Sequence, residues 1–146
     1  MSDSAEVVLR EQFSVKGGDF GHAGQVSTTI KSMLKQIGFP APVIRRVAIA
    51  TYEAEMNVVV YANEAVVTFE ATPNVITVTL EDRGRGIEDI ELAMQEGYST
   101  ATDEIREMGF GAGMGLPNIE RNSDDLAIDS EVGVGTTVKI TVFARP

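Results

Sequence analysis

The chain has 146 residues, of which 43% are hydrophobic, and its 22 acidic residues against 12 lysines and arginines give a formal net charge of −10. This length and composition allow one hydrophobic core and predict a single domain over residues 1–146. The negative charge argues against a nucleic acid as the main partner, because binding a phosphate backbone requires clustered cations. A basic protein surface would suit the chain better.

Cysteine is absent and histidine occurs once, at His22. This excludes disulfides, a thiolate metal site and a histidine-rich zinc site. We interpret His22 as a surface or capping residue without chemistry. The N-terminal residues contain no apolar signal core, and no apolar run approaches the ~18 residues that a membrane-spanning helix requires. The sequence therefore predicts a cytoplasmic protein that does not bind membranes.

The spacing of apolar residues and the positions of glycine and proline predict an alternation of helices and strands. In chain order, the expected elements are a strand over 6–15, a helix over 22–37, a helix over 43–62, strands over 65–71 and 75–80, a helix over 88–96, a glycine-rich loop over 97–115, a helix from Pro117 to about residue 124, and strands over 126–130 and 136–143. Strands joined mainly as hairpins predict an α+β fold, a two-layer sandwich whose mixed, mostly antiparallel sheet carries helices on one face.

The long helix over 43–62 carries Glu53 and Asn57 one turn apart, on the same side and at the edge of its apolar stripe. At that edge, a carboxylate and an amide can meet a ligand with water partly excluded. Taken alone, such a pair is more often two ordinary solvated residues. Its interpretation therefore depends on the motifs that follow.

An acidic residue, Asp82, stands at the end of a strand with a buried face, and Gly84 and Gly86 follow it. Such glycines allow a positive φ or a close approach between the backbone and a ligand. Taken alone, the motif is more often an ordinary structural turn.

Four glycines at every second position, Gly109, Gly111, Gly113 and Gly115, precede the helix that contains Pro117. Glycine-rich backbone entering a helix is a physical site for phosphate, because free amides converge there. The glycines match neither the P-loop nor the dinucleotide-binding fingerprint. Glycine-rich sequence also costs entropy to order, so we expect a mobile loop that leads into this helix.

Together these motifs resemble a known family. In order and spacing, they are similar to the Bergerat ATP-binding fold of the histidine-kinase-like (GHKL) ATPases, and within it to the small bacterial anti-sigma factors and switch-protein serine kinases. The resemblance covers nearly the whole chain and rests on four motifs: Glu53-x-x-x-Asn57, Asp82-x-Gly84-x-Gly86, the glycine-rich loop that ends at Gly115, and Gly135-Thr136.

The resemblance implies that the chain binds ATP with Mg²⁺ and assigns a role to each motif. Asn57 would help to hold Mg²⁺ against the phosphates, since a carboxamide oxygen is a hard ligand. Glu53 would be the base that orients or deprotonates the attacking hydroxyl or water. Asp82 would accept a hydrogen bond from the adenine amino group, which guanine lacks at that position.

The remaining implied roles concern the surroundings of the nucleotide. Thr136 would support Asp82 and a water molecule at the adenine, and Arg106 would reach the γ-phosphate. The glycines divide into two groups: Gly84 and Gly86 would give room to the base and ribose, and Gly111, Gly113 and Gly115 would close over the phosphates as a lid.

The resemblance therefore implies a serine/threonine protein kinase that depends on ATP and Mg²⁺. Its substrate would be a small regulatory protein of the anti-anti-sigma type, and a sigma factor would be a second partner. It also suggests a homodimer formed through a sheet edge or the N-terminal strand. The alternative is a non-catalytic nucleotide-binding module that acts by docking to a protein. A third reading is a structural domain whose motifs coincide by chance.

Overall fold

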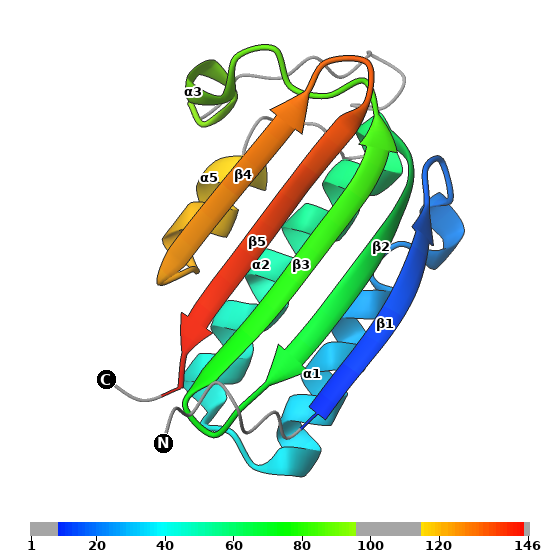
Figure 1. Cartoon of the computed structure of the whole chain (residues 1–146). Coiled ribbons are helices and arrows are strands. Elements are labelled where there is room, and N and C mark those ends of the chain that lie inside the picture. The colour runs from blue at the N-terminus through cyan, green and yellow to red at the C-terminus, as the bar shows by residue number, and fades with distance from the viewer. Residues whose placement is uncertain (1–8, 96–114, 145–146) are drawn as a thin grey trace.

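The computed structural model describes residues 9–95 and 115–144, and it has two layers, a sheet and a set of helices (Figure 1). The elements are β1 Leu9–Lys16, the 3₁₀-helix η2 Phe20–His22, α1 Gln25–Ile37, α2 Ala41–Tyr61, β2 Ala62–Ala71, β3 Val75–Gly84, α3 Ile90–Ala93, α5 Gly115–Arg121, β4 Asp125–Glu131 and β5 Gly135–Phe143. None of the described helices is long and apolar enough to cross a membrane.

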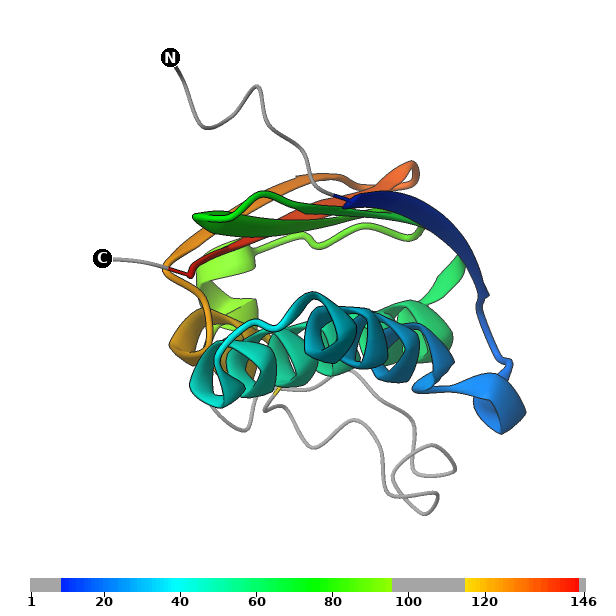
Figure 2. The ribbon, with the colours of Figure 1, turned by 90° about the horizontal axis from the view of Figure 1, so that it is seen from below.

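The five strands form one sheet in the order β1-β2-β3-β5-β4. The helices cover one face of this sheet, as the side view in Figure 2 shows. The predicted α+β fold with helices on one face is therefore confirmed. The four strand pairs of the described sheet are all antiparallel, so its pairing is more uniform than the mixed sheet that we expected.

The core lies between the two layers because side chains alternate between the faces of each strand. The helix-facing residues of the central strands are almost fully buried: Val67 and Phe69 of β2, Ile76, Val78 and Leu80 of β3, and Val138, Ile140 and Val142 of β5. They pack with Ile30 and Leu34 of α1 and Val47, Ala54 and Val58 of α2. Asp82 follows Leu80 on this same face of β3, so it stands where the core ends.

The ends of the helices follow from local chemistry. Gly38 ends α1 with a φ of 100°, a left-handed conformation that glycine adopts readily, and its N–H donates to the carbonyl of Leu34. Helix α2 starts two residues earlier than predicted, with Pro42 in its first turn. It passes directly into β2, which likewise begins three residues earlier than expected.

Two of the predicted helices have different bounds in the structure. The helix expected over 88–96 is only Ile90–Ala93, because the side chain of Asp89 accepts the N–H of Leu92 at 3.1 Å and so caps the helix after residue 88. Helix α5 ends at Arg121 rather than near residue 124. The predicted loop over 97–115 falls outside the described residues except for Gly115.

One ion pair joins α2 to the far end of the sheet. The guanidinium of Arg46 donates to both oxygens of Asp124, at 3.1 and 3.2 Å, and the backbone N–H of Phe143 donates to Oδ2 of the same carboxylate at 2.6 Å. The hydrogen bond from Arg46 is the largest influence on Asp124 and lowers the pKa of this carboxyl below its ordinary value of 3.8. The charged form of Asp124 therefore stabilises the fold.

We predict that Asp124→Asn lowers the free energy of unfolding at pH 7 by about 1 kcal/mol, as expected for a partly exposed ion pair with an added backbone hydrogen bond. Because the folded-state pKa is depressed, this contribution is present above the ordinary pKa of aspartate and is lost as the pH falls through the lower, folded value. Urea unfolding at pH 7 and pH 3 measures the difference, which should be smaller at pH 3 than at pH 7.

Arg83→Gln is a suitable control, because the ion pair between Arg83 and Glu64 has side chains that are 82% and 59% exposed. This change should leave the unfolding midpoint nearly unaltered at both pH values. An Asp124→Asn chain as stable as the wild type at pH 7 would contradict the stabilising role of the Arg46 pair.

Candidate nucleotide-binding site

Glu53 and Asn57 lie on α2 beside the start of α5, and both are half-buried. A Cβ atom on Gly115 would be 3.0 Å from Oδ1 of Asn57, so the amide packs against a position that suits glycine. The side-chain N–H of Asn118 donates to Oε2 of Glu53 at 2.8 Å. The structure therefore brings together Glu53, Asn57, Gly115 and Asn118.

Asp82 lies at the end of β3 and is supported by the first residues of β5. The backbone N–H of Thr136 donates to its Oδ1 at 2.9 Å, which is the support expected of Thr136. Burial at the edge of the core raises the pKa of Asp82 above its ordinary value of 3.8, and the hydrogen bond from Thr136 opposes this to a lesser extent. Asp82 is thus a half-buried carboxylate that is held in a fixed direction.

The side chain of Ser130, on β4, contacts the side chain of Thr136. The hydroxyls of Ser130 and Thr136 are 2.8 Å apart, and Ser130 Oγ accepts the N–H of Ile87 at 2.8 Å. Ser130 therefore connects the segment after Gly86 to the residue that supports Asp82. Sequence reasoning missed Ser130, since a serine in an exposed-looking edge strand carries no distinctive signal.

Close backbone contacts at this end of the sheet require glycine. A Cβ on Gly135 would lie 2.0 Å from the carbonyl oxygen of Asp82, and one on Gly86 would lie 2.5 Å from that of Glu131. Gly86 also has a φ of 76°. These glycines hold the β4–β5 turn against the end of β3. The role of Gly84 and Gly86 towards a base and ribose stays a prediction.

The two groups of residues lie at the same end of the molecule. A Cβ on Gly84 would be 3.4 Å from the carbonyl oxygen of Tyr61, the last residue of α2, so the end of this helix touches the end of β3. Asn57 is one turn before Tyr61 on α2. Asp82 is two residues before Gly84 on β3, so both motifs lie towards the end of the fold where α2 meets β3. Arg106, Gly111 and Gly113 lie outside the described residues.

A buried carboxylate that the sequence analysis did not identify connects α2 to α1. Glu55 is 1% exposed. Its Oε2 accepts the N–H groups of Gly24 at 3.0 Å and Val26 at 3.2 Å, and its Oε1 accepts that of Ser27 at 3.0 Å. Gly24 is the N-cap of α1 and has no side chain to cap the helix itself, so Glu55 supplies the cap from α2.

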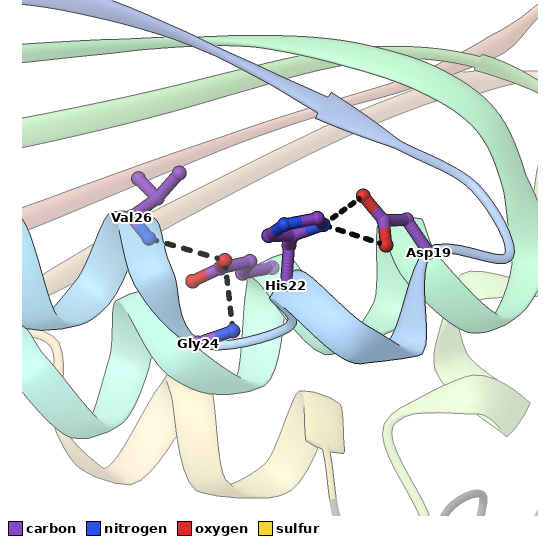
Figure 3. A network of polar contacts seen from close by, with 5 residues as sticks. Asp19, His22, Gly24 and Val26 are labelled. Atoms are coloured by element: carbon purple, nitrogen blue, oxygen red, sulfur yellow. Dashed lines mark hydrogen bonds and ion pairs between the residues drawn. The ribbon is translucent and has the colours of Figure 1, made fainter.

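His22 is exposed, as predicted for a surface residue. Its Nδ1 lies 2.9 Å from Oδ2 of Asp19, and Figure 3 shows this pair beside the N–H groups of Gly24 and Val26. Within residues 9–95 and 115–144, no three His, Cys, Asp or Glu side chains are placed to hold a metal ion. His22 thus contacts Asp19 in the η2 segment that precedes α1.

Comparisons with known proteins identify the family of the chain. A family model described as the histidine kinase-like ATPase domain matches residues 19–142. The chain is 32% identical over 121 residues to an anti-sigma F factor of Caldanaerobacter subterraneus, which covers 80% of this chain and 81% of that protein. It is 28% identical over 119 residues to the serine/threonine-protein kinase RsbT of Bacillus subtilis, covering 79% and 84% of the two chains.

A solved structure shares the fold. The crystal structure of the RsbU and RsbW domains of a Mycobacterium tuberculosis protein matches 95% of this chain with a TM-score of 0.63 and 17% sequence identity. This chain corresponds to 34% of that longer chain, so the match shows the fold alone.

The fold and the family match define a histidine kinase-like ATPase domain, a class that binds ATP. The chain belongs to the histidine kinase-like ATPase domain family, and its relatives include anti-sigma F factors and RsbT.

We predict that Asp82→Asn does not destabilise the nucleotide-free protein at pH 7. The raised pKa means that the folded state holds the proton to higher pH than the unfolded chain, so stability falls as the pH rises from 3.8 through the folded value. Asparagine removes the buried charge and keeps an oxygen for the N–H of Thr136. Its melting temperature at pH 7 should equal or exceed that of the wild type, and this gain should shrink at pH 4.

The matched control is Asp129→Asn, a change of the same chemistry at an exposed position of β4. It should leave the melting temperature nearly constant at both pH values. If Asp82→Asn lost several degrees at pH 7 while Asp129→Asn did not, Asp82 would be a stabilising residue and not a functional carboxylate kept at a cost.

Proposed function

We propose that the chain is a serine/threonine protein kinase that transfers the γ-phosphoryl group of Mg²⁺-ATP to a hydroxyl of a small regulatory protein of the anti-anti-sigma type. The observation that carries this proposal is the carboxylate of Glu53, which accepts a hydrogen bond from Asn118 and lies one turn of α2 from Asn57, the residue beside Gly115. A module that only bound nucleotide would not need an oriented carboxylate there.

Asp82 is the group that selects adenine. Its carboxylate only accepts hydrogen bonds, so it pairs with the amino group of adenine and opposes the carbonyl oxygen that guanine presents at the same position. The N–H of Thr136 fixes the direction of the carboxylate before the base arrives. Half-burial of Asp82 strengthens the hydrogen bond, because less water competes for it.

Asn57 and Gly115 serve the phosphates. The carboxamide oxygen of Asn57 suits Mg²⁺, which commonly takes few protein ligands together with water and phosphate oxygens. Because Gly115 has no side chain, α5 can start beside Asn57 without a Cβ atom pressing on the oxygen of its amide. When bound, Mg²⁺ would neutralise the negative charge of the phosphate oxygens, and Asn57 would help to fix the position of the metal ion.

Glu53 is the base. Its Oε2 accepts the N–H of Asn118, and Oε1 has no hydrogen-bond partner within the described part of the chain. Oε1 takes the proton of the acceptor hydroxyl as the hydroxyl oxygen bonds to the γ-phosphorus. The bond from the γ-phosphorus to the bridging oxygen breaks, and ADP leaves with its electrons.

The identity of the protein substrate is proposed from the relatives. One relative is named as a serine/threonine-protein kinase and others as anti-sigma F factors. We extend both descriptions to a cytoplasmic chain that phosphorylates an anti-anti-sigma-type protein and also binds a sigma factor. Its net charge of −10 suits a basic partner surface. Homodimers would form through the exposed edge strand β1.

The second candidate is a non-catalytic module that binds nucleotide and acts by docking to a sigma factor. The name of the anti-sigma F factor relatives favours it. This candidate predicts ATP binding without phosphorylation of any partner, whereas the kinase transfers phosphate to a hydroxyl.

We predict that Glu53→Gln lowers the rate of phosphoryl transfer by about 100-fold or more and changes ATP affinity only a few-fold, because glutamine cannot take a proton. Asn57→Ala should weaken Mg²⁺-ATP binding, because it removes the metal ligand. Calorimetric titration with Mg²⁺-ATP and transfer of labelled phosphate to a purified partner separate the two effects.

Glu120→Gln, an exposed glutamate of α5, is the matched control and should behave as the wild type in both assays. A Glu53→Gln chain that loses ATP binding as strongly as transfer would contradict the assignment of Glu53 as the base. A wild-type chain that binds ATP and phosphorylates no candidate would favour the docking module.

A further inference from the structure

We propose that a groove between α1 and α2 binds the acceptor segment of the protein substrate and selects its sequence. The groove would take an apolar side chain and an acidic residue close to the acceptor hydroxyl. This inference rests on the proposed kinase function and specifies which substrate the site accepts.

The groove runs along the helix layer and ends at the proposed base. It encloses about 400 Å³ and is lined on the α2 side by Ile49 and Tyr52 and on the α1 side by Thr28 and Lys31. Glu53, which Asn118 holds, forms part of the same lining. Any chain that lies in the groove therefore passes the carboxylate that would accept its proton.

The groove reaches Glu53 from the side opposite to the phosphate residues. Ile49, Glu53 and Asn57 follow one another at intervals of four along α2, on adjacent turns of one side of the helix. Asn57 contacts the position of Gly115, where the phosphates are expected, and Ile49 lies in the groove. Glu53 stands between them, which is the order that transfer from ATP to a hydroxyl requires.

The lining specifies the chemistry of the occupant. Ile49 is 37% exposed and Tyr52 is 41% exposed, so their apolar atoms are available to a buried partner side chain. Lys31 is exposed, and in the described part of the chain it has no ion-pair partner. In a chain with a net charge of −10, such a lysine beside two apolar side chains favours a carboxylate on the segment that binds there.

The two walls of the groove are held in place before a partner binds. Glu55 joins the start of α1 to α2 through three backbone N–H groups. The ring of Tyr52 lies against Gly24, where a Cβ atom would be 3.4 Å from the ring. A groove whose walls are already fixed loses little entropy when a segment binds, so it can distinguish one segment from another.

The test uses purified anti-anti-sigma-type proteins from the same organism, offered one at a time with Mg²⁺-ATP, and the best substrate is taken for kinetics. Ile49→Asp and Lys31→Glu should each raise KM for that protein at least tenfold, while kcat and the dissociation constant of ATP stay within twofold. Changing the acidic residue nearest the phosphorylated hydroxyl to lysine should restore the KM of the Lys31→Glu chain.

Ile37→Asp is the matched control, because Ile37 is 39% exposed at the end of α1 and does not line the groove. It should leave KM unchanged, and melting temperatures check that all three variants fold. An unchanged KM in both groove variants overturns the inference and leaves the kinase standing. Variants that alter ATP affinity instead of KM also overturn it, since the groove residues would then serve the nucleotide and not the protein substrate. ATP binding without phosphorylation of any candidate overturns both proposals.

Discussion

Helix α2 packs on the sheet, α1 and α5 at once, and this constraint arranges the site. Val47, Ala54 and Val58 bury one side of the helix in the core. Glu53 and Asn57 occupy the side that meets α5, and the carboxylate of Glu55 caps α1. One helix thus positions the proposed base, the proposed metal ligand and one wall of the proposed substrate groove. A rotation of α2 would displace all three together.

At the end of β3, the fold carries a residue that lowers its stability. Asp82 follows Leu80 on the core face of β3, where an apolar residue would be more stable than a carboxylate whose pKa is raised by burial. The fold tolerates this charge because Thr136 donates an N–H to it and Ser130 supports Thr136. A site kept at a cost to stability is typical of binding and catalysis.

Much of this arrangement was predictable from the sequence, because periodicity fixes which residues share a face. The spacing of Glu53 and Asn57 placed them together, and Asp82 was expected at the end of a half-buried strand. The interactions of Glu55 and Asn118 were not predicted, since their partners are 28 to 65 residues away in the chain. Helical periodicity alone places Glu55 near the apolar stripe of α2. Only the tertiary fold shows which backbone N–H groups of α1 it caps.

The most direct test of the account is the melting temperature of the wild-type protein with ATP or GTP, each with Mg²⁺. The account predicts that ATP stabilises the chain and GTP does not, because Asp82 accepts from the amino group of adenine and opposes the carbonyl of guanine. ATP at 100 times its dissociation constant should add about 2.7 kcal/mol to the free energy of unfolding. Equal shifts with both nucleotides, or no shift with either at millimolar concentration, would contradict it.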